Sequence, residues 1–166
     1  MKKLITLLLT VLLLLNLTAC GENLEKDVVG IWTLQKITYE GKTYEGDSVG
    51  YVYDDFVIYN LVFYKDRTFL IQFLPSREIA GRWGLKEEFL EEDFIFTAEE
   101  LEIIPNLPFD FYLVGADEDG YEYILSVGYI TLKNKKLTID FYGDGTVVME
   151  FIKSAKLREK PIERNQ

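Results

Sequence analysis

Turn-forming residues recur along this chain about every 8–12 positions and separate short segments rich in aromatic and β-branched residues. Polar or glycine-containing turns lie at residues 40–42, 65–66, 117–120, 133–136 and 143–145. No long segment with helical periodicity intervenes between these turns. The spacing therefore predicts an all-β domain, either a sandwich or a barrel, with roughly eight or nine short antiparallel strands.

The expected strands follow from period-two alternation and from aromatic content. Eight of them cover residues 28–39, 56–64, 67–74, 79–85, 109–114, 121–132, 137–141 and 146–153, and the ranges 94–97 and 101–104 are two short strand candidates. Glu87–Asp93 is acidic and predicts a solvated turn or one helical turn. Residues 154–166 are polar and contain Pro161, which predicts a mobile tail or a short, poorly anchored helix.

The first twenty residues have a different character from the rest of the chain. Lys2 and Lys3 precede a leucine-rich apolar run, which ends in Leu17-Thr18-Ala19-Cys20. A basic start, an apolar stretch and small residues before a cleavage point are typical of a secretory signal. Because a cysteine directly follows the small residues, the segment resembles the lipobox signal of bacterial lipoproteins.

This resemblance implies that residues 1–19 are removed and that the sulfur of Cys20 is lipidated. Residues 20–27 are then a lipidated N-terminus and spacer, followed by a domain over 28–153 and a polar tail over 154–166. Two or more acyl chains attach a protein stably to a bilayer. The expected location is therefore the cell membrane or outer membrane, outside the cytoplasm. The alternatives are an uncleaved membrane helix, which needs ~20 apolar residues, and a secreted protein with an incidental cysteine.

Charge and residue types exclude several functions. Loss of Lys2 and Lys3 leaves 16 of the 18 basic residues against 28 acidic ones, a balance of −12. Such a surface repels nucleic acid and anionic lipid headgroups, so the membrane is reached through the lipid. With no histidine and one cysteine, no disulfide, no His/Cys metal site and no Ser-His-Asp or Cys-His nucleophile can form. We therefore expect no cofactor and no enzymatic activity, although carboxylate, tyrosine or lysine chemistry and oxygen-ligand metals stay open.

Gly30-x-Trp32 on the first expected strand, followed by a turn and a meander of hairpins, resembles the lipocalin and lipocalin-like group. The resemblance implies an up-and-down antiparallel β-barrel of about eight strands. Trp32 would close one end of it, and Gly30 would let the chain bend there. Trp83, in a second Gly-x-Trp, begins a similar element. In that family an arginine near the last strand stacks on the first tryptophan. In this chain Lys153, Lys156 or Arg158 could take that place.

Other candidate residues have a simple structural interpretation beside a functional one. Tyr51, Tyr53, Tyr59 and Tyr64 either line an open barrel mouth or reflect ordinary strand composition. Asp117–Gly120 is either a Ca²⁺ loop or, as we expect, a plain turn, and Asp54, Asp55 and Asp144 are expected turn acids. Glu87–Asp93 either contains a glycosidase-like carboxylate pair or is, as we expect, a solvated face.

The leading functional hypothesis is a membrane-anchored lipocalin-like barrel that binds a small apolar or amphipathic ligand in the cell envelope. A barrel of this size either fills with side chains or holds one small ligand. The alternative is a protein-interaction or inhibitor lipoprotein without a small-molecule ligand. The sequence identifies no ligand-binding residues, no metal ligands and no protein partner.

Overall fold

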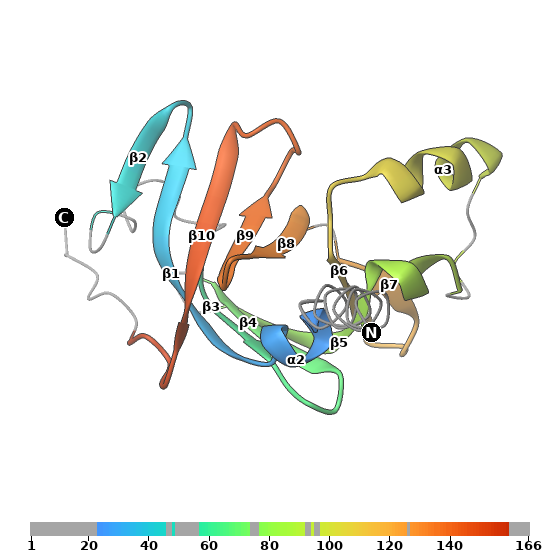
Figure 1. Cartoon of the computed structure of the whole chain (residues 1–166). Helices are drawn as coiled ribbons and strands as arrows, with labels where there is room; N and C mark the ends of the chain where they lie inside the picture. Colours follow the sequence, from blue (N-terminus) through green and yellow to red (C-terminus); the bar gives the residue numbers. More distant parts are fainter. Residues whose placement is uncertain are drawn as a thin grey trace, which may run out of the picture.

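The structure is a computed structural model, which describes residues 23–45, 48, 57–73, 77–91, 94, 97–125 and 127–159. Its main element is one closed antiparallel barrel (Figure 1). Around the barrel, the strands are β1 (Gly30–Tyr39), β3 (Ile58–Phe63), β4 (Thr68–Phe73), β5 (Glu78–Leu85), β6 (Phe111–Ala116), β8 (Tyr129–Lys133), β9 (Lys136–Asp140) and β10 (Val147–Ser154), and β10 pairs with β1. The prediction of an all-β, up-and-down barrel of about eight strands is confirmed.

Two short strands extend this barrel. β2 (Lys42–Glu45) pairs with the second half of β1, and β7 (Glu122–Ile124) pairs with the second half of β6. The expected turns at 117–120 and 133–136 form the β6–β7 and β8–β9 connections. Asn134 and Lys135 both have positive φ, as two-residue hairpin turns of the favoured type require.

One end of the barrel is closed by a short helix, α2 (Leu24–Val28), which lies beneath the strands in Figure 1. Asn23 caps this helix, because its side chain accepts a hydrogen bond from the amide of Lys26. Val28 is fully buried and its carbonyl accepts a 2.6 Å hydrogen bond from Nε1 of Trp32. The first strand therefore begins at Gly30 and not at Val28, and residues 24–27 of the predicted spacer are helical.

A helical excursion separates β5 from β6. It contains the 3-10 helix η2 (Lys86–Glu91), the helix α3 (Ala98–Ile103) and the 3-10 turn η3 (Ile104–Asn106). The strand predicted over 101–104 is wrong, and no described residue of 94–97 belongs to a strand. Thr97 and Glu100 form a reciprocal capping box, which starts a helix at this point. The helical turn expected within Glu87–Asp93 is confirmed by η2.

The strand predicted over 121–132 is divided into β7 and β8. Gly128 lies between them with φ near +100°, and a Cβ there would come within 2.6 Å of the carbonyl oxygen of Asp140. This close approach turns the chain from β7, which leaves the barrel, back into the barrel at β8. One predicted strand therefore becomes two strands with different partners.

The first part of the predicted C-terminal tail is held against the barrel. Asn60, which is fully buried, exchanges two 2.9 Å hydrogen bonds with the backbone of Arg158. The guanidinium of Arg158 also donates to the carbonyl of Leu34. This contact lies beside the point at which the ladder between β1 and β3 ends, at Thr33 and Asn60. Residues up to Glu159 therefore belong structurally to the domain.

Candidate ligand-binding groove

Side chains fill the barrel interior in the described part of the chain. Phe63, Trp83 and Phe111 pack against one another with ring centroids 5.6–6.1 Å apart. They belong to one continuous cluster of buried residues that reaches from Val28 to Phe151. Every buried side-chain nitrogen or oxygen among the described residues has a hydrogen-bond partner. The described interior is therefore packed with apolar side chains, and two of them, Phe111 and Leu113, also line the groove described below.

A second apolar cluster lies on the outer side of β6. Successive side chains of a strand point to opposite faces, and here Phe111 and Leu113 enter the interior while Tyr112 and Val114 face outward. Their outward neighbours come from the helical excursion, where Phe89 lies 5.0 Å from the ring of Tyr112. β6 is therefore buried on both faces.

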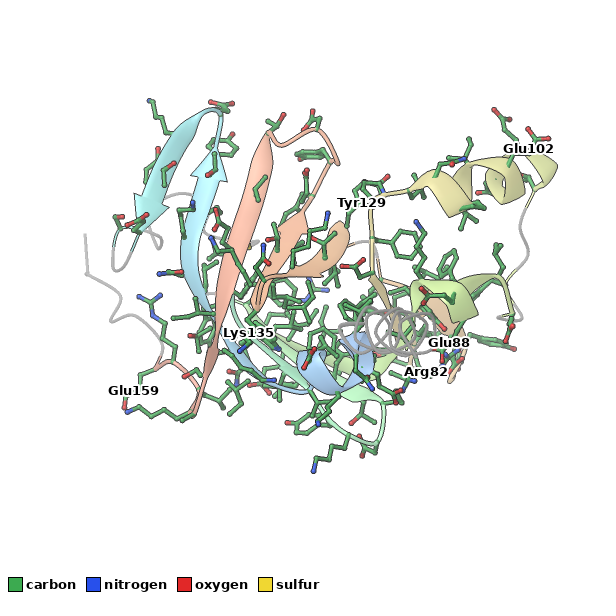
Figure 2. The ribbon with its side chains drawn as sticks, in the orientation of Figure 1. Arg82, Glu88, Glu102, Tyr129, Lys135 and Glu159 are labelled. Carbon is green, nitrogen blue, oxygen red and sulfur yellow. The ribbon has the colours of Figure 1, made fainter. Side chains whose placement is uncertain are left out.

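A groove of about 640 Å³ lies between this excursion and the barrel wall. It is apolar along most of its length. The helical side contributes Phe89, Ile103, Ile104 and Leu107, and the barrel side contributes Tyr112, Ile124, Leu125, Val127, Tyr129 and Ile130. In Figure 2, Tyr129 lies on the side of the barrel that faces α3. The volume falls within the range of about 300–1,000 Å³ that is usual for small-molecule sites.

The groove follows the weakest seam of the barrel. β6 and β8 share one ladder pair, Phe111 with Ile130, whereas the other neighbouring barrel strands share at least four. Asp110 strengthens the seam, since its amide donates to the carbonyl of Ile130 and its carboxylate accepts from the amide of Leu132, both at 2.7 Å. The carboxylate of Asp110 thus takes the place of the backbone carbonyl that would accept from the amide of Leu132 in a continuous ladder.

The rim of the groove carries its polar groups and its exposed apolar surface. Tyr142 is 70% exposed and Ile103 is 49% exposed, although both line the groove. Glu100 also lines it, and hydrogen bonds from the backbone and side chain of Thr97 lower the pKa of its carboxyl. The groove therefore combines an apolar wall with a charged carboxylate and tyrosine hydroxyls.

Lys86 fixes the excursion to the barrel. Its ammonium donates to the carbonyl of Leu107 and lies 5.1 Å from the ring centroid of Phe109. Its amide donates to the carbonyl of Asp110, next to the seam. These contacts hold both ends of the excursion together, so the groove exists without a ligand.

The residues singled out in the sequence lie away from this groove. Trp32 is 1% exposed, and its indole donates to the carbonyl of Val28 at the barrel end that α2 covers. Lys153, one of the three candidate partners, lies over its ring with Nζ 5.5 Å from the centroid. Trp83 is also buried, and the guanidinium of Arg67 lies 4.5 Å from its centroid. Both tryptophans are core residues that carry a cation on one face.

The candidate acids serve local structure where the structure describes them. Asp117 accepts hydrogen bonds from the amides of Asp119 and Tyr121, which confirms a plain turn. Asp144 accepts from the amide of Thr146 in the same way, and hydrogen bonds from the side chain and the amide of Thr146 lower the pKa of its carboxyl. Glu88 pairs with Arg67 and accepts from the amide of Leu85. Across the described residues, no three of the acidic, histidine or cysteine side chains form a group that could hold a metal ion.

Other predictions fall partly or wholly outside the described residues. These are the signal segment 1–19, Cys20, Tyr51, Tyr53, Asp54, Asp55 and the end of the tail. Of the remaining tyrosines, Tyr59 is half-buried and Tyr64 is 44% exposed, and neither lines the groove. In the described ranges, no helix is long and apolar enough to cross a bilayer.

The groove residues themselves were not identified from the sequence. The signal that could have found them is the capping box Thr97-x-x-Glu100, because it interrupts the β-meander and predicts a helix that must cover some face of the barrel. Comparisons with protein families, curated proteins and solved structures find no match for this chain. The class of protein therefore rests on the strand order, which defines a closed eight-stranded antiparallel β-barrel with a filled interior and a lateral groove.

Proposed function

We propose that this protein is a non-enzymatic envelope lipoprotein, anchored through Cys20, that binds a small amphipathic ligand in the groove beside β6 and β8. The groove is the observation that carries the proposal. It is apolar, has the volume of a small-molecule site and keeps exposed apolar residues at its rim. It runs along the β6–β8 seam of the barrel and reaches the interior residues Phe111 and Leu113.

The chemistry of the walls selects the ligand. An alkyl chain or a flat apolar ring system would contact Ile103, Leu107 and Val127, where burial of each methylene contributes about 0.8 kcal/mol. A hydroxyl, an amide or a cationic group at the end of the ligand would lie near Glu100 and Tyr142. An anionic head would be repelled there, because Glu100 stays charged. The ligand class is therefore apolar with a neutral or cationic polar end.

Native mass spectrometry of the mature protein, purified after exposure to envelope lipids, tests this directly. We expect a bound small molecule. A fluorescent alkylamine should bind to the same groove, and the neutral polar change Ile103→Asn should weaken its binding about tenfold, which is 1.4 kcal/mol. Ile103 is half-exposed, so this change leaves the fold intact.

Ile152→Asn is the matched control, because Ile152 is an exposed isoleucine on β10 that does not line the groove. It should leave probe binding unchanged. If no small molecule copurifies and the alkylamine binds equally to both variants, the ligand proposal fails.

The anchor has its own test. Cys20→Ser should release the domain from the membrane fraction and leave its unfolding midpoint unchanged. A processed Cys20→Ser protein that still sediments with membranes would contradict the anchor.

The alternative of an interaction lipoprotein is favoured by a second surface. Tyr121 is 73% exposed and Tyr123 is 44% exposed on the β6–β7 hairpin, and exposed tyrosines are enriched in protein interfaces. Crosslinking in intact cells separates the two functions. A stoichiometric protein partner, together with an empty groove in the purified protein, would favour the alternative.

A further inference from the structure

The barrel end closed by α2 is fastened to the chain segment that directly follows Cys20. The guanidinium of Arg67 lies 3.0 Å from the carboxylate of Glu25 on α2 and 3.1 Å from that of Glu88. Lys153 Nζ donates to the carbonyl of Asp27 at 2.8 Å, on the other side of the helix. With the hydrogen bond from Trp32, these contacts fix α2 at three points of the barrel end.

The distance between this end and the anchor is short. Three residues separate Cys20 from Leu24, the first residue of α2. Four Cα–Cα steps of about 3.8 Å span at most about 15 Å. A lipid on Cys20 therefore holds the α2-capped end toward the bilayer, and the fixed helix keeps the barrel from turning over.

The α2-capped end also carries basic residues in an otherwise acidic protein. Lys26 lies on α2, Lys65 lies on the turn beside Arg67, and Lys133 and Lys135 flank the β8–β9 turn. That turn lies at the same end, because Lys136 pairs with Ile152 next to Lys153, and Figure 2 places Lys135 there. Among the described residues, none of these lysines has an acidic side chain within ion-pair distance. The acidic side chains at this end include Glu25 and Glu88, which pair with Arg67, Asp66, which accepts from Thr68, and Asp27 on α2.

The opposite end is acidic. Glu40 lies on the β1–β2 turn, and Asp140 and Asp144 lie at the β9–β10 turn, which adjoins it through a backbone hydrogen bond between Glu40 and Thr146. β1 has 10 residues and spans the barrel between the two ends. At about 3.3 Å per residue and with barrel tilt, the ends lie roughly 20–30 Å apart.

We propose that the α2-capped end, defined by Lys26, Lys65, Lys133 and Lys135, docks on the anionic phospholipid headgroups of the membrane that holds the anchor. This rests on the proposed lipidation of Cys20. The Debye length is about 8 Å at physiological ionic strength. A tether of at most about 15 Å lets the lysines approach the headgroups to within that distance, while the acidic end stays beyond it. The negative net charge is therefore screened, and the local positive charge acts on the bilayer.

Orientation is the first measurement. Because Cys20 is the only cysteine and is acylated in the lipidated protein, an introduced cysteine is a unique labelling site. Lys133→Cys and Thr43→Cys place a fluorophore at the α2-capped end and on β2 at the other end. On phosphatidylglycerol vesicles with a headgroup-attached quencher, we expect at least threefold stronger quenching for the label at 133. Equal quenching at both sites, or stronger quenching at 43, would overturn the proposal.

Charge is the second measurement. Lys26→Glu with Lys65→Glu should reduce the quenching at 133 by at least half, and about 0.5 M salt should do the same by screening. Lys42→Glu with Arg77→Glu makes the same charge change away from the α2-capped end and should have no effect. If quenching is equally strong on phosphatidylcholine and insensitive to both double variants, headgroup docking is wrong.

Two further measurements distinguish a failure of the proposed lipid anchor from a failure of the proposed docking surface. Mass spectrometry reports whether Cys20 carries acyl chains. If it carries none, the proposed anchoring fails, and the surface is judged by sedimentation of the Cys20→Ser protein with phosphatidylglycerol vesicles. Binding that Lys26→Glu with Lys65→Glu lowers at least threefold supports the surface, and no binding at low salt overturns it.

Discussion

Lys153 lies over the indole ring of Trp32, with Nζ 5.5 Å from the ring centroid, and the same Nζ atom donates to the carbonyl of Asp27. One cation therefore joins the last strand to the first strand and to the helix that precedes it. The side chain also fills the space beside Gly30, where a Cβ would come within 2.7 Å of Lys153 Cε. These contacts make the α2-capped end a single packed unit.

Loss of the Lys153 side chain should destabilise the domain. An exposed cation–π contact contributes about 0.5–1 kcal/mol and a hydrogen bond contributes about 1 kcal/mol. Lys153→Ala should therefore lower the free energy of unfolding in urea by about 1–2 kcal/mol. Lys153→Arg keeps the charge and a donor and should lose less than half of that. An alanine variant with an unchanged urea midpoint would show that the contact contributes nothing.

Gly30→Ala should destabilise the domain through both backbone and packing. Gly30 has φ near +140°, a region that residues with a Cβ rarely enter, and its added methyl group would contact Lys153. We expect a loss of about 1–3 kcal/mol, measured by thermal unfolding. Gly41→Ala is the control, because Gly41 has φ near +75° with open space around its Cβ position. A Gly30 variant as stable as the Gly41 variant would remove the packing argument.

Asp110→Ala should open the β6–β8 seam locally. The amide of Leu132 loses its acceptor, so its hydrogen exchange should accelerate at least tenfold, whereas amides on β10 should be unaffected. Asp110→Asn keeps an acceptor oxygen and should exchange close to the unmodified rate. Uniform acceleration across all strands would indicate global destabilisation and not a local seam.

Glu150 should make stability depend on pH. Burial alone would raise the pKa of this carboxyl, but hydrogen bonds and charges from Lys136 and Lys36 outweigh burial and lower it. A lowered pKa in the folded state stabilises the fold above the ordinary glutamate pKa of about 4.3, and the effect is lost as the pH falls below it. Glu150→Gln should therefore be less stable at pH 7 and should flatten the loss of stability on acidification. Parallel curves for both proteins would exclude this role.

The parts of the fold that the sequence predicted are those governed by local rules. Turn residues located the β6–β7 and β8–β9 connections. Lys153 was one of three possible partners for Trp32, and only the register of β10 against β1 selects it, since Lys153 pairs with Trp32. The partner of Trp32 therefore depends on a pairing between the first and last strands, which local sequence rules do not describe.

The candidate groove was not predictable in the same way. Its walls come from β6, the β7–β8 connection and the excursion, and their apolar residues have the same composition as core strands. The segment 101–104 was predicted as a strand because Leu101, Ile103 and Ile104 are apolar. The capping box at Thr97 instead starts a helix that includes the first three of the four residues in this segment. Period and composition cannot tell an apolar helix that covers a barrel from a short buried strand.

The closure of β1 on β10 also governs when the domain can form. This pairing runs from Ile31 with Ser154 to Tyr39 with Val147, so it joins the first strand made to the last. Folding that depends on such distant contacts is slow, because a long loop must close before the contacts stabilise it. The chain therefore stays without a closed barrel until β10 has been synthesised. Until then β1 and β9 keep open edges, which other chains can pair with, so the stage before β10 is in place is the one most exposed to aggregation.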